Sequence, residues 1–396
     1  MEQNPSQKIM GLHRNIFFTG LVSFFMDFSS EMVYPLVPLF LSTVLGAPKS
    51  VIGLIEGIAE STASLLKVFS GWLSDRLGHR KWLMALGYGI STLSRPLIAT
   101  APNWGQVLAS RFMDRFGKGI RNAPRDALIA ESCQEHVLGR SFGFHRGMDT
   151  LGAVVGPAVA FGLLAYFQGQ YRWVFWLSII PGALAVLTII FFIHETRTCP
   201  VGEAEIPKPA WSRFSLPYKY FIVVVTLFSL GNSSDVFLIL RAQNVGLSAA
   251  VIPLVYMVFN VIYGLGALPA GLLSDRIGPK PIILMAFFFF GLIYLGFARA
   301  GHPYQIWLLF VAYGLFMAMT EGVQKAYLAT LVPPEFKATG FGLYNTLVGL
   351  AVFPASLVGG FLWDRLGPQA TFYYGTATAW LAALLFVGLL LKKEKR

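Results

Sequence analysis

The chain has 396 residues, of which 55% are hydrophobic and only 13% are charged, and its net charge is +11. A water-soluble domain carries about a quarter charged residues, so this composition excludes an ordinary soluble protein. The cations lie mostly in short intervals between apolar runs and form no soluble basic domain, which excludes a nucleic-acid-binding protein and favours membrane insertion.

Apolar runs of about 20 residues, long enough to cross a bilayer, recur along the whole chain. The first run is too long for the apolar part of a signal peptide and lacks a small-residue cleavage site, so we interpret it as a transmembrane helix. We predict an all-α membrane protein with twelve transmembrane helices over residues 14–42, 49–73, 82–101, 104–130, 139–166, 172–194, 218–242, 248–273, 280–299, 304–332, 337–362 and 369–391.

The longest polar interval, from Glu195 to Pro217, carries four prolines and reads as a linker. It predicts an N-terminal six-helix half over residues 1–194, a linker over 195–217 and a C-terminal half over 218–396. Lys and Arg concentrate at both termini, in the linker and in alternate loops, so we expect these parts to be cytoplasmic. The compact loops suggest a bacterial inner membrane. Cys133 and Cys199 then lie on the cytoplasmic side, where a structural disulfide is not expected.

Ionisable residues interrupt several of the predicted helices. Asp27 and Glu31 lie four residues apart on the first helix, and Glu321 and Lys325 have the same spacing on the tenth. Intramembrane charges are costly and usually mark a substrate or proton path. A buried carboxylate that loads and releases a proton is a minimal coupling device. We therefore expect Asp27, Glu31, Asp149 and Asp235 to couple protons.

The fourth helix carries more cations than packing requires. Arg111, Arg115, Lys118 and Arg125 follow one stripe at helical spacing, and Asp114 can pair with Lys118 at i+4. Such a stripe inside a membrane is expected to face a water-filled cavity. We expect the substrate to be bound by Arg115, Lys118, Arg121, Arg146, Glu321 and Lys325.

One short phrase occurs twice, 200 residues apart, as Gly71-Trp-Leu-Ser-Asp75-Arg76-Leu-Gly78 and as Gly271-Leu-Leu-Ser-Asp275-Arg276-Ile-Gly278. A repeat at half the chain length indicates two homologous halves. The glycines allow a tight turn, and the aspartate can face the N-terminus of a neighbouring helix. Arg76 and Arg80 can pair with acids of the opposite half or with lipid phosphate. A weaker third copy, Gly359 to Gly367, follows the eleventh helix on the opposite face of the membrane.

The phrase G-x-L-x-D-R-x-G-x-[RK] resembles the loop signature of the major facilitator superfamily. The resemblance implies two pseudo-symmetric six-helix halves that alternate access to a central site. It also implies a cytoplasmic latch, or gate motif, at Gly71, Asp75, Arg76, Gly78, Arg80, Asp275 and Arg276.

The fifth helix is similar to a second motif, that of drug:proton antiporters. Gly143, Gly152, Gly156 and Pro157 match the spacing G-x8-G-x3-G-P, but Ala160-Phe161 stands where the family has a glycine pair. Ordinary small-residue helix packing would explain the same glycines.

These features together predict a secondary transporter driven by the proton gradient, because the chain has no nucleotide-binding loop. The expected cavity carries both positive and negative side chains, which favours a small anionic or zwitterionic organic solute, or a metal chelate such as a siderophore. A multidrug/H+ antiporter and a non-transporting membrane sensor are the alternatives. We expect no enzymatic activity, no cofactor and no bound metal, and partners limited to the solute and the lipid bilayer. Superfamily relatives act mostly as monomers, and we expect the same here.

Overall fold

The computed structural model describes residues 8–9, 12–77, 79–132, 138–195, 214–333 and 336–391. Apart from short connections and one hairpin, these residues are helical. The hairpin pairs β1 (Lys8–Ile9) antiparallel with β2 (Leu12–His13). The helices are α1 (Arg14–Val33), the 3-10 turn η2 (Tyr34–Leu36), α2 (Val37–Thr43), α3 (Lys49–Leu77), α4 (Arg80–Ala99), α5 (Trp104–Glu131), α6 (Leu138–Tyr166), α7 (Tyr171–Leu177), α8 (Ile179–Phe192), α9 (Leu216–Gly231), α10 (Val236–Asn244), α11 (Ile252–Ile277), α12 (Pro279–Arg299), α13 (Pro303–Leu331), α14 (Lys337–Leu366) and α15 (Pro368–Leu391).

The helices confirm the predicted spans, whose ends lie within four residues of the observed ones. Among the described residues, nine spans are long and apolar enough to cross a membrane by length and composition. The long helices α3, α4 and α5 are not among these nine. Helix α5 is the one that carries the charge stripe, and its charged residues explain why composition alone does not select it.

Three of the predicted spans are broken rather than continuous. The first consists of α1, η2 and α2, with Pro35 in the 3-10 turn. The sixth consists of α7 and α8, which meet at Ser178. The seventh is interrupted between α9 and α10 by the polar residues 232–235. A proline cannot donate the helical hydrogen bond, and polar side chains can bond the backbone groups that a break leaves free. Broken helices are therefore tolerated where protein surrounds those groups.

The repeated phrase lies at helix ends and not in loops, which corrects the prediction. Helices α3, α11 and α14 continue through it to Leu77, Ile277 and Leu366. The last glycine of the second and third copies ends the helix, because Gly278 and Gly367 have φ angles of +89° and +95°. Side chains other than glycine rarely adopt such angles, so the last glycine of the phrase acts as a helix stop.

The chain forms two compact units. Unit 1 comprises Met1–Phe40 and Thr62–Glu205, and unit 2 comprises Leu41–Ser61 and Ile206–Arg396. The first part of α3 therefore packs with the C-terminal helices, while the rest of α3 packs in unit 1. The boundary near Glu205 falls inside the predicted linker. The division of the sequence into halves at residues 195–217 stays a prediction.

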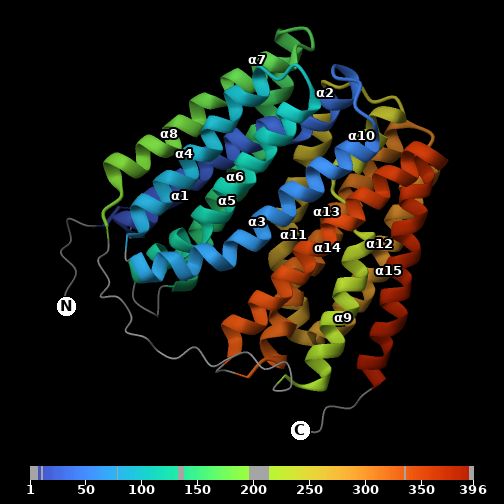
Figure 1. The fold of residues 1–396 in the computed structure, drawn as a ribbon. Helices are drawn as coiled ribbons and strands as arrows, with labels where there is room; N and C mark the ends of the chain where they lie inside the picture. Colours follow the sequence, from blue (N-terminus) through green and yellow to red (C-terminus); the bar gives the residue numbers. More distant parts are fainter. Residues whose placement is uncertain are drawn as a thin grey trace. The chain divides into compact units, whose positions relative to one another are not determined.

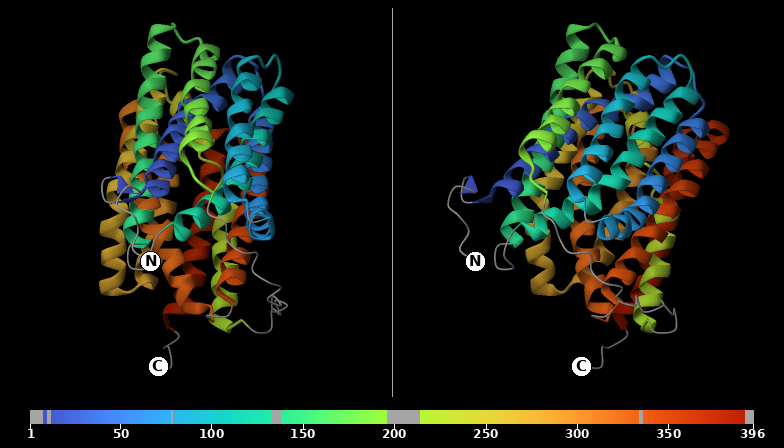
Figure 2. Two further views of the ribbon diagram at one scale, coloured as in Figure 1. Left: turned by 90° about the vertical axis from the view of Figure 1, so that its left-hand side faces the viewer. Right: turned by 60° about the vertical axis from the view of Figure 1, so that its left-hand side comes forward.

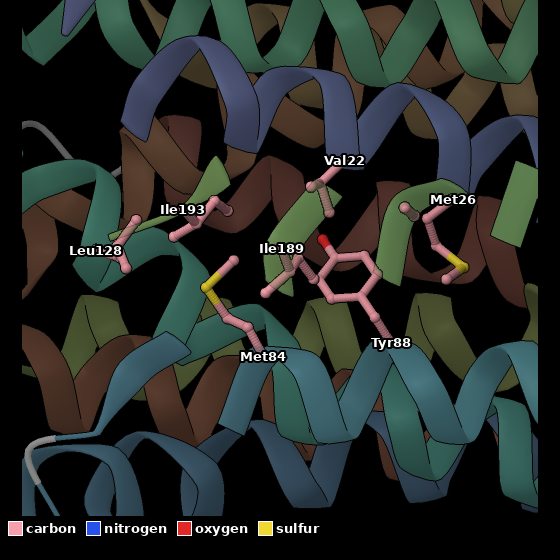
Figure 3. Packing of buried hydrophobic residues seen from close by; sticks show 8 residues of the cluster. Val22, Met26, Met84, Tyr88, Leu128, Ile189 and Ile193 are labelled. Carbon is pink, nitrogen blue, oxygen red and sulfur yellow. The ribbon is translucent and has the colours of Figure 1, made fainter. Parts of the chain in front are cut away.

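In unit 1, α1 packs against α6 and α8, and α4 packs against α5 and α8 (Figure 1). Figure 3 shows the apolar core of this unit, where Met84 and Tyr88 of α4 meet Ile189 of α8 and Val22 of α1. In a bilayer, helix association depends on close packing more than on burial from water, because the lipid is as apolar as the core.

Glycines make two of these helix contacts possible. A Cβ added to Gly117 of α5 would lie 2.4 Å from the carbonyl oxygen of Gly87 in α4. A Cβ added to Gly152 of α6 would lie 2.5 Å from the carbonyl oxygen of Phe24 in α1, and Gly156 is similarly close to Phe28. Gly143 has open space instead. Two of the three glycines in the antiporter-like motif therefore serve the α1–α6 contact.

In unit 2, α11 packs on α13, and α15 packs on α9, α12 and α14. The two views in Figure 2 show the orange and red helices of this unit running side by side. Aromatic rings fill the spaces between them: Phe228 of α9 stacks on Phe287 of α12 at 4.3 Å between centroids, and Phe297 of α12 stacks on Phe372 of α15 at 5.5 Å. This packing accounts for part of the high phenylalanine content of the chain.

Candidate functional site

The α1–α6 contact brings together two predicted proton-coupling residues. The carboxyl groups of Asp27 on α1 and Asp149 on α6 are close neighbours. Ser23 Oγ donates to Asp149 Oδ1 at 2.7 Å, and Arg146 Nη1 donates to Asp149 Oδ2 at 3.2 Å. Two neighbouring carboxyl groups can share one proton, because a protonated carboxyl group donates and an ionised one accepts.

Glu31 lies one helical turn beyond Asp27 and faces α5. Its charged neighbours are Lys118, Arg115, Asp149 and Arg111. Its Oε2 atom is buried and has no hydrogen-bond partner among the described residues. The side chains of both Glu31 and Lys118 are half-buried. Within the described part of the chain, Lys118 makes no ion pair, although Asp27 and Glu31 are near it. Glu31 and Lys118 thus lie next to each other, and each can still form a hydrogen bond or ion pair with a ligand.

Asp114 is the centre of a buried ionic cluster beside this pair. Its carboxylate lies 3.2 Å from Arg95 Nη2 of α4 and 3.6 Å from the Nη1 atoms of both Arg111 and Arg115. The expected i,i+4 pair with Lys118 is wrong, because Arg95 approaches Asp114 from α4 and two arginines of α5 complete its surroundings. The aspartate side chain is only 4% exposed. A buried charge requires such pairing, since an unpaired one would be strongly destabilising.

Tyr34 joins this cluster from the turn that follows α1. The guanidinium carbons of Arg111 and Arg115 lie 5.4 Å and 5.8 Å from the centre of its ring. Arg95 Nη2 also donates to Ser30 Oγ at 2.9 Å. Among the described residues, three arginines and one aspartate form this cluster, which lies next to Glu31 and Lys118. A low-dielectric site with excess cations is suited to holding an anion.

The remaining cations of α5 have other surroundings. Arg121 donates to Ser91 Oγ, and its guanidinium lies 4.5 Å from the ring centre of Tyr88. It is buried at the α4–α5 contact, where it packs the two helices together. Arg125 pairs with the neighbouring Asp126 at 2.9 Å.

Unit 2 contains the other predicted site residues. Asp235 stands at the start of α10 and accepts a hydrogen bond of 2.6 Å from Tyr313. The carboxylates of Glu56 and Glu60 on α3 are its charged neighbours. On α13, Lys325 pairs with Glu321 at 3.1 Å as the spacing predicts, and both side chains are exposed. Tyr263 donates to the same glutamate.

The gate motif is only partly described. The side chains of Asp75 and Arg76, the surroundings of Gly71 and the whole of Gly78 lie outside what the structure describes. Arg80 is buried and pairs with Glu131 at the end of α5, within unit 1. Its expected pairing with the opposite half or with lipid stays a prediction.

The charged residues of the second copy have different surroundings from those of Arg80. Asp275 and Arg276 are exposed at the end of α11, and in the described part of the chain neither forms an ion pair. The predicted latch role of these residues stays a prediction.

Sequence reasoning did not single out Arg95, Tyr34 or Glu195 for the roles that they have here. The available signal for Arg95 was its position inside the apolar run of the third predicted helix. Glu195 accepts hydrogen bonds from the backbone nitrogens of Arg80 and Lys81 at 2.8 Å and 3.2 Å, and so caps α4 from the end of α8. Nothing in the sequence indicates a partner 115 positions away.

Comparisons with known proteins agree with this architecture. The family model described as Major Facilitator Superfamily matches residues 19–241 and 220–396. An uncharacterised MFS-type transporter of Methanocaldococcus jannaschii is 34% identical over 397 residues, which cover 97% of each chain. A homologue of the multidrug resistance efflux pump PmrA from Lactococcus lactis is 28% identical over 366 residues and covers 89% of each chain.

A solved structure extends the likeness to three dimensions. The crystal structure of a POT family transporter in complex with 5-aminolevulinic acid has a TM-score of 0.81 to this chain, with 13% identity, and covers 98% of this chain and 97% of that one. At this identity the likeness shows the fold alone. The twelve-helix fold and the resemblance drawn from the repeated phrase are thereby confirmed. The chain is an integral membrane transporter that belongs to the Major Facilitator Superfamily.

Proposed function

We propose that this transporter moves a small anionic or zwitterionic organic solute by proton-coupled alternating access. The observation that carries the proposal is the closeness of Lys118 to Glu31, beside the arginines that surround Asp114. An enclosed solute must find partners for its charged groups, because desolvating them without partners is costly.

The geometry suggests a role for each group. The solute carboxylate would bind Lys118, which makes no ion pair within the described residues, with Arg115 on Tyr34 behind it. A solute ammonium group would bind Glu31, whose buried Oε2 atom needs a donor. A metal chelate rich in carboxylates would use the same cations. Arg121 is excluded from direct contact in this proposal, because Tyr88 and Ser91 occupy its guanidinium.

The Asp27–Asp149 pair supplies a route for proton coupling. Lys118 is a charged neighbour of Asp27, and its ammonium group attracts an ionised carboxylate. A solute anion on Lys118 would weaken that attraction and favour a proton on the pair. Coupling of this kind is reciprocal, so a proton on Asp27 would also strengthen solute binding. Solute and proton would then bind together, as symport requires.

The Lactococcus lactis relative favours a second candidate function, multidrug/H+ antiport. That protein is described as a multidrug resistance efflux pump homologue, and Gly152, Gly156 and Pro157 follow the antiporter spacing. Such a pump would bind hydrophobic cations at the acids and would not need the cations of α5. We favour the anion because Lys118, which makes no ion pair within the described residues, lies beside the arginine cluster of α4 and α5.

A transport assay in proteoliposomes that are loaded at one pH and diluted into buffer of another pH distinguishes the two candidate functions. We expect radiolabelled dicarboxylates or amino-acid-like zwitterions to accumulate when the outside is acidic, and Lys118→Met to abolish that accumulation. Asp126→Asn, a charge change on the exposed end of the same helix, is the matched control and should transport normally. Accumulation of ethidium-like cations alone, unaffected by Lys118→Met, would establish the drug antiporter instead.

The acids are tested in the same vesicles. Asp27→Asn and Asp149→Asn should keep solute exchange between two loaded sides but lose accumulation driven by the pH gradient. Unchanged gradient-driven accumulation in both variants would place coupling elsewhere, with Asp235 as the next candidate. We further propose that the protein works as a monomer without a cofactor in a bacterial cytoplasmic membrane, with both termini inside.

A further inference from the structure

Buried polar atoms without a hydrogen-bond partner gather at the break between α9 and α10. Within the described part of the chain, they are Ser233 Oγ and Asn232 Oδ1 in the break and the hydroxyl of Tyr294 on α12. Ser233 is 3% exposed, and Tyr294 is fully enclosed. The Tyr294 hydroxyl has Ser233 and Asp235 as close neighbours, so two of these oxygens lie beside one carboxylate. Native structures seldom leave such groups unpaired, which indicates a ligand or an ordered water between them.

The interrupted helix supplies further oxygens at the same place. Helix α9 ends at Gly231, and the carbonyl oxygens in the last turn of a helix have no helical partners. Tyr374 donates to one of them, that of Leu230, at 2.9 Å. The C-terminal end of a helix also carries partial negative charge. Breaks in membrane helices therefore coordinate small cations through such carbonyls.

Asp235 has bonding capacity left for a ligand at this break. Its Oδ1 atom accepts a hydrogen bond of 2.6 Å from Tyr313, and this is its only hydrogen bond within the described residues. An ionised carboxylate has about four lone-pair sites on its two oxygens. The second oxygen of Asp235 can therefore bind a cation while Tyr313 holds the first.

Neighbouring helices fix these groups in position. The backbone nitrogen of Ser234 donates to Ser356 Oγ of α14 at 3.1 Å, which holds the break against that helix. The ring of Tyr294 stacks on Phe290 at 4.0 Å and contacts Phe372 of α15 at 5.5 Å. All of these residues belong to unit 2. A ligand would meet oxygens that are already ordered, so its binding would not have to order them.

The donor set favours a monovalent cation. Oxygen donors without sulfur or imidazole suit hard cations. Among the described residues, no three acidic, histidine or cysteine side chains are placed to hold one metal ion, which argues against the several carboxylates that Ca²⁺ takes. Glu56 and Glu60 of α3 are charged neighbours of Asp235 and repel its negative charge. A single positive charge on Asp235 would relieve this repulsion.

We propose that Asp235, Ser233 and Tyr294, with carbonyl oxygens at the end of α9, form a binding site for an alkali cation, for which Na⁺ is the probe. The site belongs to unit 2, whereas Lys118 and Glu31 belong to unit 1. The inference goes beyond the proposed anion transport and does not depend on it. It assigns a metal ion to Asp235, for which the charge pattern alone predicts a proton.

Two measurements on the purified chain test the site. One is binding of radioactive Na⁺ by scintillation proximity, and the other is thermal unfolding in NaCl, KCl, LiCl or choline chloride at equal ionic strength. We expect an alkali cation to raise the unfolding temperature above that in choline, because a ligand of the folded state stabilises it. Asp235→Asn should abolish both effects. Ser233→Ala and Tyr294→Phe should each weaken the affinity roughly tenfold to hundredfold, the range for one polar contact with a charged group.

Matched variants separate loss of the cation from loss of the fold. Ser233→Ala and Tyr294→Phe remove oxygens without a partner among the described residues, so both should unfold normally in choline. Ser229→Ala, one turn earlier on α9, is the control for Ser233→Ala, because Ser229 Oγ already donates to the carbonyl oxygen of Val225 at 2.8 Å. Tyr373→Phe, at a side chain that is 45% exposed, is the control for Tyr294→Phe. Both controls should bind Na⁺ as the unaltered chain does.

Equal unfolding temperatures in alkali and choline salts, with no binding of labelled Na⁺, would overturn the inference and leave ordered water as the partner of these oxygens. Binding that persists in Asp235→Asn, or stabilisation by divalent cations alone, would overturn it as well. Neither measurement contains a solute. Failure of every anion in the transport assay would therefore count against the proposed substrate and not against the cation site.

Discussion

Removal of the Asp114 carboxylate tests whether the cluster on α4 and α5 is a charge-balanced buried site. Asp114→Asn keeps the size of the side chain and removes the negative charge that lies 3.2 Å to 3.6 Å from three arginines. The side chain of Arg95 is 3% exposed, so water cannot take over the role of the carboxylate.

The magnitude follows from the difference between buried and exposed ion pairs. Breaking a buried pair leaves uncompensated charge and costs about 3–5 kcal/mol. Asp126→Asn is the matched control, because Asp126 lies on the same helix, pairs with Arg125 at 2.9 Å and has a side chain that is 51% exposed. An exposed pair contributes about 0–1 kcal/mol. Asp114→Asn should therefore lower the free energy of unfolding by about 2–5 kcal/mol more than Asp126→Asn.

Unfolding in mixed micelles, followed by circular dichroism as the fraction of denaturing detergent rises, gives both free energies. A second variant checks the cause: Asp114→Asn combined with Arg95→Met should recover part of the loss, because one uncompensated cation is gone. Equal stability of the two single variants, within about 0.5 kcal/mol, would refute the assignment of Asp114 as the required counter-charge.

Three further predictions concern packing and capping. Gly152→Val should destabilise the fold by about 1–3 kcal/mol, because its side chain meets the backbone of Phe24, whereas Gly143→Val on the same helix has open space; equal effects in the micelle assay would contradict the α1–α6 contact. Tyr313→Phe removes the bond to Asp235 and should cost about 1.5–3 kcal/mol, against little change for the exposed Tyr373→Phe. Glu195→Ala removes the cap of α4, so it should lower the free energy of unfolding by about 0.5–2 kcal/mol and speed amide exchange at Arg80 and Lys81. Unaltered exchange protection at these two residues would contradict the cap.

Sequence alone predicted the helices well because the bilayer imposes a simple rule on them. Each span needs an apolar run of about 20 residues, and each apolar run is visible in the chain. Helix interruptions were not predicted. Pro35 indicated one, but the break at residues 232–235 depends on partners such as Ser356, whose Oγ accepts from the backbone nitrogen of Ser234 at 3.1 Å. A hydrogen bond over 122 positions leaves no local pattern.

The candidate site was predictable in its residue types and not in its pairs. Helical spacing placed Arg111, Arg115 and Lys118 on one stripe, and those residues do lie together. The same spacing suggested Lys118 as the partner of Asp114, but Arg95 on the neighbouring helix is nearer. Spacing describes one helix, whereas a buried carboxylate is satisfied by every helix around it. Asp364 in the third copy of the phrase shows the same limit. The copy could be recognised in the sequence, but the hydrogen bonds that Asp364 accepts from the backbone nitrogens of Lys49 and Ser50 at the start of α3 could not.

Binding of a solute anion at Lys118 is the central claim, and thermal unfolding of the purified protein with a panel of ligands tests it most directly. A ligand that binds only the folded state raises its stability by about 2.7 kcal/mol at a concentration of 100 times Kd. Lys118→Met is the decisive variant, because Lys118 makes no ion pair within the described residues and its removal should leave the fold intact. We predict stabilisation by organic anions, zwitterions or metal chelates, lost in Lys118→Met and kept in Asp126→Asn. Stabilisation by hydrophobic cations alone, or anion stabilisation that persists in Lys118→Met, would contradict the claim.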